Sequence, residues 1–423
     1  MEINGLVLLL AQIAAVLLVS RTLGFGARAL GQPLVIAEMV AGIALGPSLL
    51  GWLLPHASAA LFPASSTAVL KMLSQLGLVL FMFLVGIELD PKLLKGRGKA
   101  SVIISHSSIV VPFALGLGAA FWLHAGYAPP GVAFLPFALF LGISMSVTAF
   151  PVLARILTER GLFRSRVGAI AIACAAVDDV TAWCLLAVVV AIARAQGIVE
   201  AAWTVGLSLL FSGFMLYVAR PLLRRAERYI LDKRGSLTPG LVAGVLFLLL
   251  LSAGITEAIG VHALFGAFLF GAVLPREGGL DKVMAHKLES VAVLLLLPLF
   301  FAFSGLRTRI GLVSGVGEWL VVLALIGLAT LGKYGGSTLA ARFTGSGWRE
   351  ASAIGVLMNT RGLMELIVLN VGLDLGVISP TLFAMLVIMA LVTTFATTPI
   401  LKLVYPDSEL QREAPEEAAL SRT

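Results

Sequence analysis

The sequence predicts an all-α polytopic membrane protein, and three observations indicate this fold class. Hydrophobic residues make up 59% of the chain and charged residues only 13%, a balance that one water-soluble core cannot accommodate. Apolar stretches of about 18 to 25 residues recur from end to end, and each is long enough to cross a bilayer as a helix. The alternating pattern typical of β-strands is absent, so the spans are expected to be helices and not a barrel.

The apolar stretches define about thirteen transmembrane helices. The first lacks the basic start and the small-residue cleavage site of a removable signal, so it is kept as a span. In order, the predicted spans cover residues 5–20, 33–50, 69–89, 101–123, 132–157, 167–193, 201–220, 237–256, 259–275, 289–306, 319–341, 350–371 and 380–403.

Basic residues concentrate in every second loop. Lys92, Lys95, Arg97 and Lys99, for example, follow the third span. Because cytoplasmic loops carry the excess of Lys and Arg, we predict a multi-pass protein of the plasma (inner) membrane with its N-terminus outside and its C-terminus in the cytoplasm. This topology also accounts for the net charge of +7 without any binding of nucleic acid.

Two segments far apart in the chain are similar and run in opposite directions. Residues 80–94 read LFMFLVGIELDPKLL, and residues 299–313 read LFFAFSGLRTRIGLV. They lie in the third and tenth spans, and a shift of seven spans reverses the direction through the membrane. Inverted repeats of this kind are common in secondary transporters that work by alternating access.

The repeat predicts the domain organisation. Residues 1–403 are expected to form one transmembrane transporter unit, with inverted repeats at about 1–193 and 237–403 and a linker helix at about 201–220. Residues 404–423 are expected to be a short, disordered cytoplasmic tail, since they are polar and rich in charge.

The fifth and twelfth spans, which correspond under this repeat, are both interrupted. The fifth contains GISMSVTAFPVLARIL, in which Pro151 removes a backbone donor, and the twelfth contains VLMNTRGLMEL. Unwound backbone in a membrane is tolerated only where it is buried in protein or lines a wet cavity. The interruptions therefore predict a substrate site near the midplane, unless they are a pair of ordinary kinks. The candidate ligands there are Ser144, Thr148, Asn359 and Thr360.

Three charged residues lie deep inside predicted spans. Asp178 and Asp179 are adjacent in the sixth span, where an ionised carboxylate costs roughly 2.5–3.5 kcal/mol. Lys333 lies in the eleventh span among glycines, which allow another helix to approach closely. We expect Lys333 to pair with one aspartate. Neighbouring helical residues point about 100° apart, so the other aspartate can face a cavity. The alternative is a purely structural ion pair.

A buried carboxylate can exchange a proton for a cation. Removal from water favours the protonated form of a carboxyl group, whereas the deprotonated oxygens suit a hard monovalent cation such as Na⁺ or K⁺. This competition is sufficient for exchange if the site faces one side of the membrane at a time. We therefore expect Asp178 and Asp179 to be the cation- and proton-binding residues and Lys333 to be their charge partner.

Four further residues are assigned structural roles. Arg361 and Glu365 are four apart on one predicted helix and are expected to pair locally as structural charges. Cys174 and Cys184 are ten apart on another helix, about 15 Å, which is beyond the reach of a disulfide. The two Cys and five scattered His lack the spacing of a resident metal site. Exchange of ions involves no chemical catalysis, so no enzymatic activity and no cofactor are expected.

Five motifs distributed over the membrane region resemble one known family. They are SVTAFPVLARIL (146–157), AAVDDVTAW (175–183), GVHALFGAFLFGAVLP (260–275), LPLFFAFSGLRT (297–308) and NTRGLMELIVLNVG (359–372). Together they resemble the monovalent cation:proton antiporter superfamily, the sodium/hydrogen exchanger-like proteins, and in particular the branch with Kef-type potassium efflux systems and plant cation/H⁺ exchangers.

The resemblance implies a fold and roles for individual residues. It implies about thirteen helices, a core domain with two crossed broken helices, a dimerisation domain and a homodimer with elevator-like movement. It makes Asp179 the residue that transiently binds the monovalent metal ion or the proton, Asp178 its partner and Lys333 the counter-charge. Relatives with this trio tend to be electrogenic. Unlike Kef-type systems, this sequence shows no cytosolic nucleotide-binding domain.

The sequence thus predicts a secondary active transporter that exchanges Na⁺ or K⁺ for H⁺. Its expected partners are the cation, the proton, the lipid bilayer and a second copy of the chain. The alternative from another class is a cation channel or cation-gated sensor that uses the same acidic site. Export of an organic anion is a third possibility, and the acidic pair disfavours it.

Overall fold

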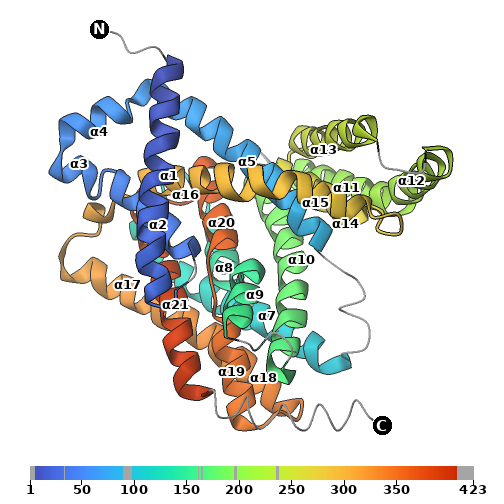
Figure 1. The fold of residues 1–423 in the computed structure, drawn as a ribbon. Helices are drawn as coiled ribbons and strands as arrows, with labels where there is room; N and C mark the ends of the chain where they lie inside the picture. The colour runs from blue at the N-terminus through green and yellow to red at the C-terminus, as the bar shows by residue number, and fades with distance from the viewer. Residues whose placement is uncertain are drawn as a thin grey trace. The chain divides into compact units, whose positions relative to one another are not determined.

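The computed structural model describes residues 5–32, 34–88, 98–160, 162, 165–194, 198–234 and 238–406, and the regular secondary structure of these residues is helical throughout (Figure 1). Contacts between residues divide the chain into two compact units. The first unit consists of Met1–Val19, Leu53–Pro91 and Trp183–Phe303, and the second of Ser20–Trp52, Lys92–Ala182 and Ser304–Thr423.

Each unit has its own set of helices. The first contains α4 (Pro55–Leu61), the 3-10 turn η1 (Ala64–Ser66), α5 (Thr67–Glu88), α11 (Ile198–Phe214), η2 (Met215–Ala219), α12 (Arg220–Arg234), α13 (Pro239–Ile259), α14 (Ala263–Val273), α15 (Leu280–Glu289) and η3 (Ser290–Leu296). The second contains α2 (Leu34–Leu45), α7 (Gly98–Tyr127), α8 (Phe134–Ser146), α9 (Phe150–Glu159), η4 (Ile310–Leu312), α17 (Gly315–Thr330), η5 (Leu331–Gly335), α18 (Gly336–Phe343), α19 (Trp348–Met358), α20 (Leu363–Asp374) and α21 (Pro380–Val404). Four helices contribute to both: α1 (Gly5–Ala29), α3 (Leu50–Leu53), α10 (Arg166–Arg194) and α16 (Leu297–Arg307).

In the first unit, glycines bring α5 and α14 into direct backbone contact. A Cβ atom added at Gly86 would lie 2.2 Å from the carbonyl oxygen of Phe268, and one added at Gly271 would lie 2.2 Å from that of Phe83. Small residues allow this close packing of helices in a bilayer, where hydrophobic burial between helices contributes little.

The second unit contains both interrupted spans. The segment between α8 and α9 covers residues 147–149, and the segment between α19 and α20 covers residues 359–362. The first interruption precedes Pro151, which is the second residue of α9. A proline is tolerated there because the first turn of a helix leaves its N–H groups without intrahelical partners.

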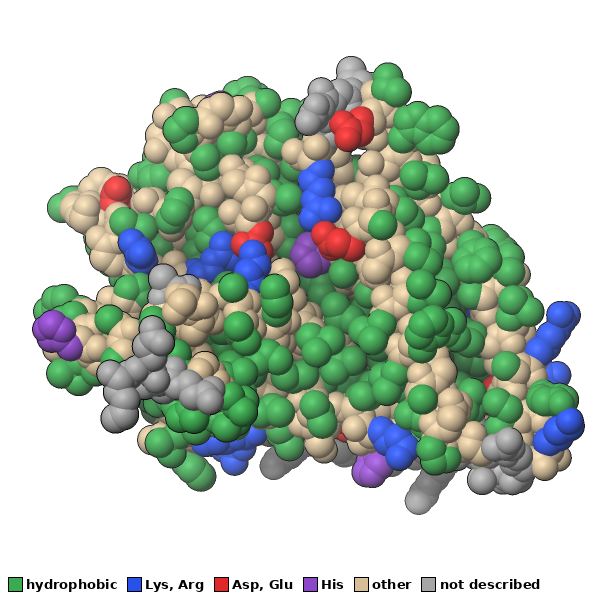
Figure 2. Space-filling view, turned by 90° about the horizontal axis from the view of Figure 1, so that it is seen from above, with side chains coloured by type: hydrophobic (Ala, Val, Ile, Leu, Met, Phe, Trp, Pro, Cys, Tyr) green, Lys and Arg blue, Asp and Glu red, His purple; other side chains and the backbone are tan. Residues whose placement is uncertain are grey.

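The helices and their surfaces are those of a multi-pass membrane protein. Among the described residues, ten helices are long and apolar enough to cross a membrane, and α8 and α14 are shorter apolar helices. Large hydrophobic side chains such as Leu18 and Trp203 are more than two-thirds exposed, and hydrophobic or uncharged side chains cover most of the face shown in Figure 2. The fold class is confirmed, while the count of about thirteen crossings stays a prediction.

Several helices extend well beyond the predicted spans, and α1 for example continues from the predicted end at residue 20 to Ala29. The helix predicted at 201–220 continues through η2 and α12 to Arg234, and the span predicted at 289–306 begins at Leu280 as α15. The added turns carry charged residues such as Arg224 and Lys287. A helix can continue past its apolar segment through turns that carry charged side chains, because these turns keep the backbone hydrogen bonds. Hydropathy detects only the apolar segment, so it underestimated the length of these helices.

Candidate ion-binding site at the two interrupted helices

The two interruptions bond to each other through backbone and side-chain groups. The backbone N–H of Ala149 donates to the carbonyl oxygen of Thr360 at 3.0 Å. The hydroxyl of Thr148 lies 3.1 Å from the carbonyl oxygen of Met358, the last residue of α19. Unwound backbone inside a membrane needs such internal partners, so each interruption stabilises the other.

Asp178 projects from α10 into a cluster of hydroxyl groups. Ser105 donates to its Oδ1 at 2.5 Å, while Ser108 and Thr148 donate to its Oδ2 at 3.0 and 2.9 Å. Hydroxyls on α7 and on the interruption after α8 therefore hold the carboxylate from two elements. Each oxygen of this buried carboxylate therefore accepts at least one hydrogen bond.

Lys333 completes this cluster. Its Nζ lies 3.1 Å from Asp178 Oδ2, 2.9 Å from Ser108 Oγ and 2.6 Å from Thr148 Oγ1. An ammonium group has three N–H donors, and these three oxygens give each donor of Lys333 an acceptor. The residue lies in η5, a π-helical turn of the type often found at functional sites. The ion pair expected between Lys333 and one aspartate is thus present with Asp178, and both side chains are almost completely buried.

Asp179 lies next to Asp178 on α10 and is only 2% exposed. Because adjacent residues of an α-helix point about 100° apart, its carboxylate leaves the helix in a different direction from that of Asp178. The carboxylate of Asp178 is the one that pairs with Lys333. Asp178 and Asp179 therefore have different surroundings, although they are adjacent in the sequence.

Arg361 and Glu365 form the expected local ion pair, and both are fully buried. They do not share one helix as predicted, because Arg361 lies in the interruption before α20 and Glu365 lies in the first turn of α20. Arg361 also donates through Nη1 to the carbonyl oxygen of Ser144 and through Nη2 to that of Met145, each at 2.8 Å. These carbonyl groups lie in the last turn of α8, where carbonyl oxygens have no intrahelical N–H partner. The C-terminal end of a helix also carries a partial negative charge, which favours a cation there. Arg361 therefore caps one interrupted helix while it belongs to the other.

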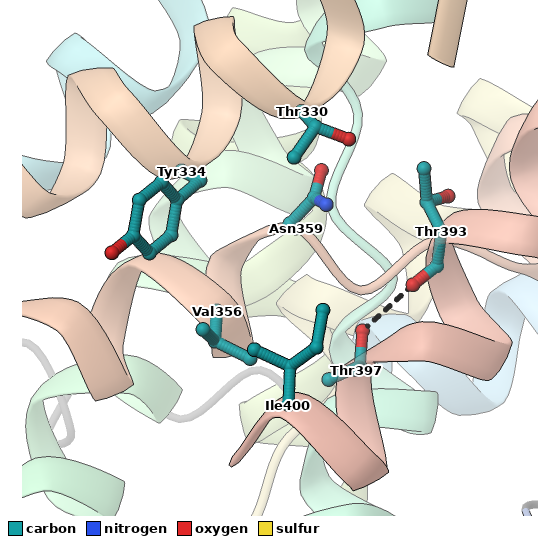
Figure 3. A pocket seen from close by; sticks show the side chains of 7 residues that line it. All are labelled: Thr330, Tyr334, Val356, Asn359, Thr393, Thr397 and Ile400. Atoms are coloured by element: carbon teal, nitrogen blue, oxygen red, sulfur yellow. Dashed lines mark hydrogen bonds between the residues drawn. The ribbon is translucent and has the colours of Figure 1, made fainter. Parts of the chain in front are cut away.

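The remaining candidate ligands lie apart from the ion pair. The hydroxyl of Ser144 donates to the carbonyl oxygen of Phe140 within its own helix. Thr360 is fully buried and contributes its carbonyl oxygen to the contact with Ala149. Asn359 lines a separate cavity with Thr393 and other residues (Figure 3). Of the four candidate ligands at the interruptions, Thr148 has its hydroxyl in the cluster around Asp178.

Sequence reasoning missed two residues of this cluster, Ser105 and Ser108. The signal was present: Ser101, Ser105 and Ser108 are spaced four and three apart in an otherwise apolar span and so share one helical face. Among the residues that the structure describes, no group of three or more His, Cys, Asp or Glu side chains is arranged to hold a metal ion. Cys174 and Cys184 are free thiols.

Helices that cross a membrane, two joined interruptions and a buried ion pair define a class of protein, the membrane transporters with broken helices. The chain matches the family model described as "Sodium/hydrogen exchanger, transmembrane" over residues 13–403. It belongs to that family. The resemblance inferred from the motifs is confirmed, and with it the class of secondary cation:proton exchangers.

Named relatives agree with this family. The chain is 43% identical over 410 residues to the Na(+)/H(+) antiporter NhaS4 of Synechocystis sp., covering 96% of this chain and 99% of that protein. It is 41% identical over 403 residues to cation/H(+) antiporter 17 of Arabidopsis thaliana, covering 95% and 49%, and 37% identical over 416 residues to K(+)/H(+) antiporter 1 of Saccharomyces cerevisiae, covering 96% and 47%. The chain therefore spans about half the length of these plant and yeast relatives.

A solved structure supports the fold. The sodium proton antiporter MjNhaP1 from Methanocaldococcus jannaschii aligns with a TM-score of 0.66 over 94% of this chain and 97% of that one, at 16% sequence identity. At this identity the comparison concerns the fold alone.

Proposed function

We propose that this chain exchanges a monovalent cation, Na⁺ or K⁺, for H⁺ by alternating access, with Asp179 as the residue that binds them in turn. The cluster around Asp178 carries the proposal. Both oxygens of Asp178 accept hydrogen bonds, and Lys333 balances its charge. Asp178 is therefore committed to the ion pair, while the buried carboxylate beside it on α10 is directed elsewhere.

The chemistry of exchange follows from burial. A carboxylate removed from water is favoured in its protonated form, and a hard cation can replace the proton by binding the same oxygens. Asp179 thus carries either a proton or a cation. Thr148 and the interruption backbone lie beside Asp178 and Lys333, where they position the site. No chemical bond of a substrate changes, so we propose transport without enzymatic activity and without a cofactor.

The assembly and placement of the protein are part of the same proposal. We propose a homodimer in the plasma (inner) membrane, with the N-terminus outside and the C-terminus in the cytoplasm, as the distribution of basic loops indicates. The inverted repeats at about 1–193 and 237–403, with the linker at about 201–220, belong to this proposal too. The predicted tail at 404–423 lies outside the described residues from position 407 on.

Proteoliposomes test this function. Dequenching of a pH-sensitive dye on addition of Na⁺, K⁺ or Li⁺ is expected for the wild-type protein and is expected to be lost in Asp179→Asn, which keeps the size of the side chain but cannot hold the proton. Glu277→Gln is the matched control, because Glu277 is 60% exposed and paired only at the surface with Arg228. Its exchange should equal that of wild type.

Two results would overturn the proposal. Wild-type exchange in Asp179→Asn would remove Asp179 from the transport site. Cation flux that continues with no counter-movement of protons would instead identify a channel.

A further inference from the structure

A cavity of about 190 Å³ lies in the second unit beside the second interruption (Figure 3). It extends from Asn359, at the end of α19, to Ile400, in the C-terminal part of α21. Five of its seven lining residues carry a polar group, and these five come from α17, η5, the second interruption and α21. The lining residues used below are Thr330, Asn359, Thr393, Thr397 and Ile400.

Asn359 directs an unsatisfied amide group into this cavity. The residue is 8% exposed, and its Oδ1 accepts no hydrogen bond from the described part of the chain. Figure 3 shows the amide between Thr330 on one side and Thr393 on the other. A buried carbonyl oxygen without a partner costs about 1–3 kcal/mol, so a donor inside the cavity would stabilise this arrangement.

Further unsatisfied polar atoms belong to the elements around the cavity. The hydroxyls of Thr360 at the interruption and Thr398 on α21 are also buried and have no hydrogen-bond partner among the described residues. Neither residue lines the cavity itself, but each follows a lining residue in the chain. Along α21 the sequence TTFATT repeats threonine pairs four residues apart and so places hydroxyls on one side of a membrane helix. Dry cavities in proteins are apolar, whereas cavities with several polar partners hold water.

We propose that this cavity is a hydrated chamber that admits water and small monovalent cations from the end of α21 at Ile400 to the helix interruption at Asn359. At roughly 30 Å³ for each water, a volume of 190 Å³ accommodates about six. The chamber's polar lining groups are neutral, the hydroxyls of Thr393 and Thr397 being bonded to carbonyl oxygens within α21, and its residues are not those of the cluster around Asp178 and Lys333. It is therefore an additional hydrophilic site on the side of the interruption that faces α21.

This inference rests on the proposed function in one respect only, that the ions entering the chamber are the ions exchanged. Hydration of the chamber can be measured without transport. An experiment can therefore reject the hydrated chamber and the cation:proton exchange separately.

Cysteine accessibility tests the chamber. In a background of Cys174→Ala and Cys184→Ala, Thr393→Cys and Thr397→Cys are labelled in proteoliposomes with 2-aminoethyl methanethiosulfonate, a small ammonium reagent. Only the thiolate reacts, and it forms where water solvates it. Val392→Cys is the matched control, since Val392 has nearly the same depth along α21 but is 44% exposed on another side of the helix. We expect Thr393→Cys and Thr397→Cys to react at least about tenfold faster than Val392→Cys.

A second variant tests the entrance. Ile400→Trp places a larger side chain at the end of the cavity and is expected to slow the labelling of Thr393→Cys to the rate of Val392→Cys. Labelling of Thr393→Cys and Thr397→Cys no faster than that of Val392→Cys would show a dry cavity and overturn the proposal. Labelling of Thr393→Cys that is unchanged by Ile400→Trp would overturn the assigned entrance. If labelling is fast but the protein exchanges no cation, the chamber stands and the proposed function fails.

Discussion

Lys333 and Asp178 are stable in the interior because each has a complete set of hydrogen bonds in addition to the opposite charge. A buried ion pair repays the loss of hydration only when its remaining donors and acceptors are also satisfied. Three side-chain hydroxyls, from Ser105, Ser108 and Thr148, provide this completion. The cluster is therefore a cooperative unit, and removal of one charge leaves the other uncompensated.

Removing the charge of Lys333 should destabilise the protein strongly. Lys333→Met keeps an unbranched apolar stem but leaves Asp178 buried without a cation, a change that typically costs about 3–5 kcal/mol. The melting temperature of the purified protein should fall, and the double variant Lys333→Met/Asp178→Asn should recover most of the loss. Arg194→Ala is the control, because the Arg194–Glu257 pair is partly exposed and worth about 0–1 kcal/mol.

Two outcomes would contradict this account of the ion pair. One is a Lys333→Met variant that melts like wild type. The other is a double variant whose loss equals the sum of the two single losses, since that would show no coupling between the residues.

At the residue scale, the sequence predicted the buried charges because an ionised group in a membrane is rare and costly. It did not predict Ser105 and Ser108, because serine is common in membrane helices and carries no such cost. Nor did it predict the direction of Asn359. That residue caps the C-terminus of α19 with φ −81° and ψ 7°, and beyond a helix end the 3.6-residue period no longer tells which way a side chain points.

At the scale of elements, α7 and α8 pack closely through glycine. A Cβ atom at Gly116 would lie 2.7 Å from the Cα of Gly142 and 2.9 Å from the carbonyl oxygen of Leu141. Both atoms belong to the backbone of α8 and cannot move aside without shifting the helix. The position of α7, which carries Ser105 and Ser108, therefore depends on this contact.

Gly116→Ala should separate α7 from α8 and lower both stability and exchange. Overpacking of this kind costs about 1–3 kcal/mol. Gly118→Ala, two residues further along α7, meets no atom within 4 Å and should be neutral or gain up to about 1 kcal/mol from the higher helix propensity of alanine. Thermal unfolding and the dye assay on both variants check this. Equal stability of the two would argue against the close contact.

Most helices could be predicted from apolar length, because a span must match the thickness of the hydrocarbon. Their ends could not, as α12 and α15 show, since charged turns continue a helix beyond the membrane. The π-helical turns were also absent from the prediction. The turn that holds Lys333, Leu331–Gly335, differs from ordinary helix in its hydrogen-bond register and not in its composition.

At the scale of the whole molecule, residues distant in sequence form each compact unit. The unit with the ion pair is made from Ser20–Trp52, Lys92–Ala182 and Ser304–Thr423. Hydropathy identifies which segments are spans, but contacts between spans depend on side-chain shape and cannot be obtained from apolar length. The two compact units do not test the predicted inverted repeats, which stay a prediction.

Exchange by the whole molecule is expected to respond to the membrane potential. We predict that each cycle moves more protons than cations and so carries net charge, worth about 2.3 kcal/mol per 100 mV. Na⁺-driven proton movement in proteoliposomes should therefore change when a potassium diffusion potential is imposed with valinomycin. Liposomes with equal potassium on both sides are the control. Identical rates in both would indicate one-for-one, electroneutral exchange.

The guanidinium of Arg361 restricts how the protein can move. It belongs to the segment between α19 and α20, yet it bonds the carbonyl oxygens of Ser144 and Met145 at the end of α8. Pulling the two segments apart would leave two carbonyl groups of α8 and the guanidinium donors that bind them without these partners, although Arg361 would keep its ion pair with Glu365. If the site turns from one compartment to the other as proposed, we expect both segments to move together as one block that keeps these hydrogen bonds.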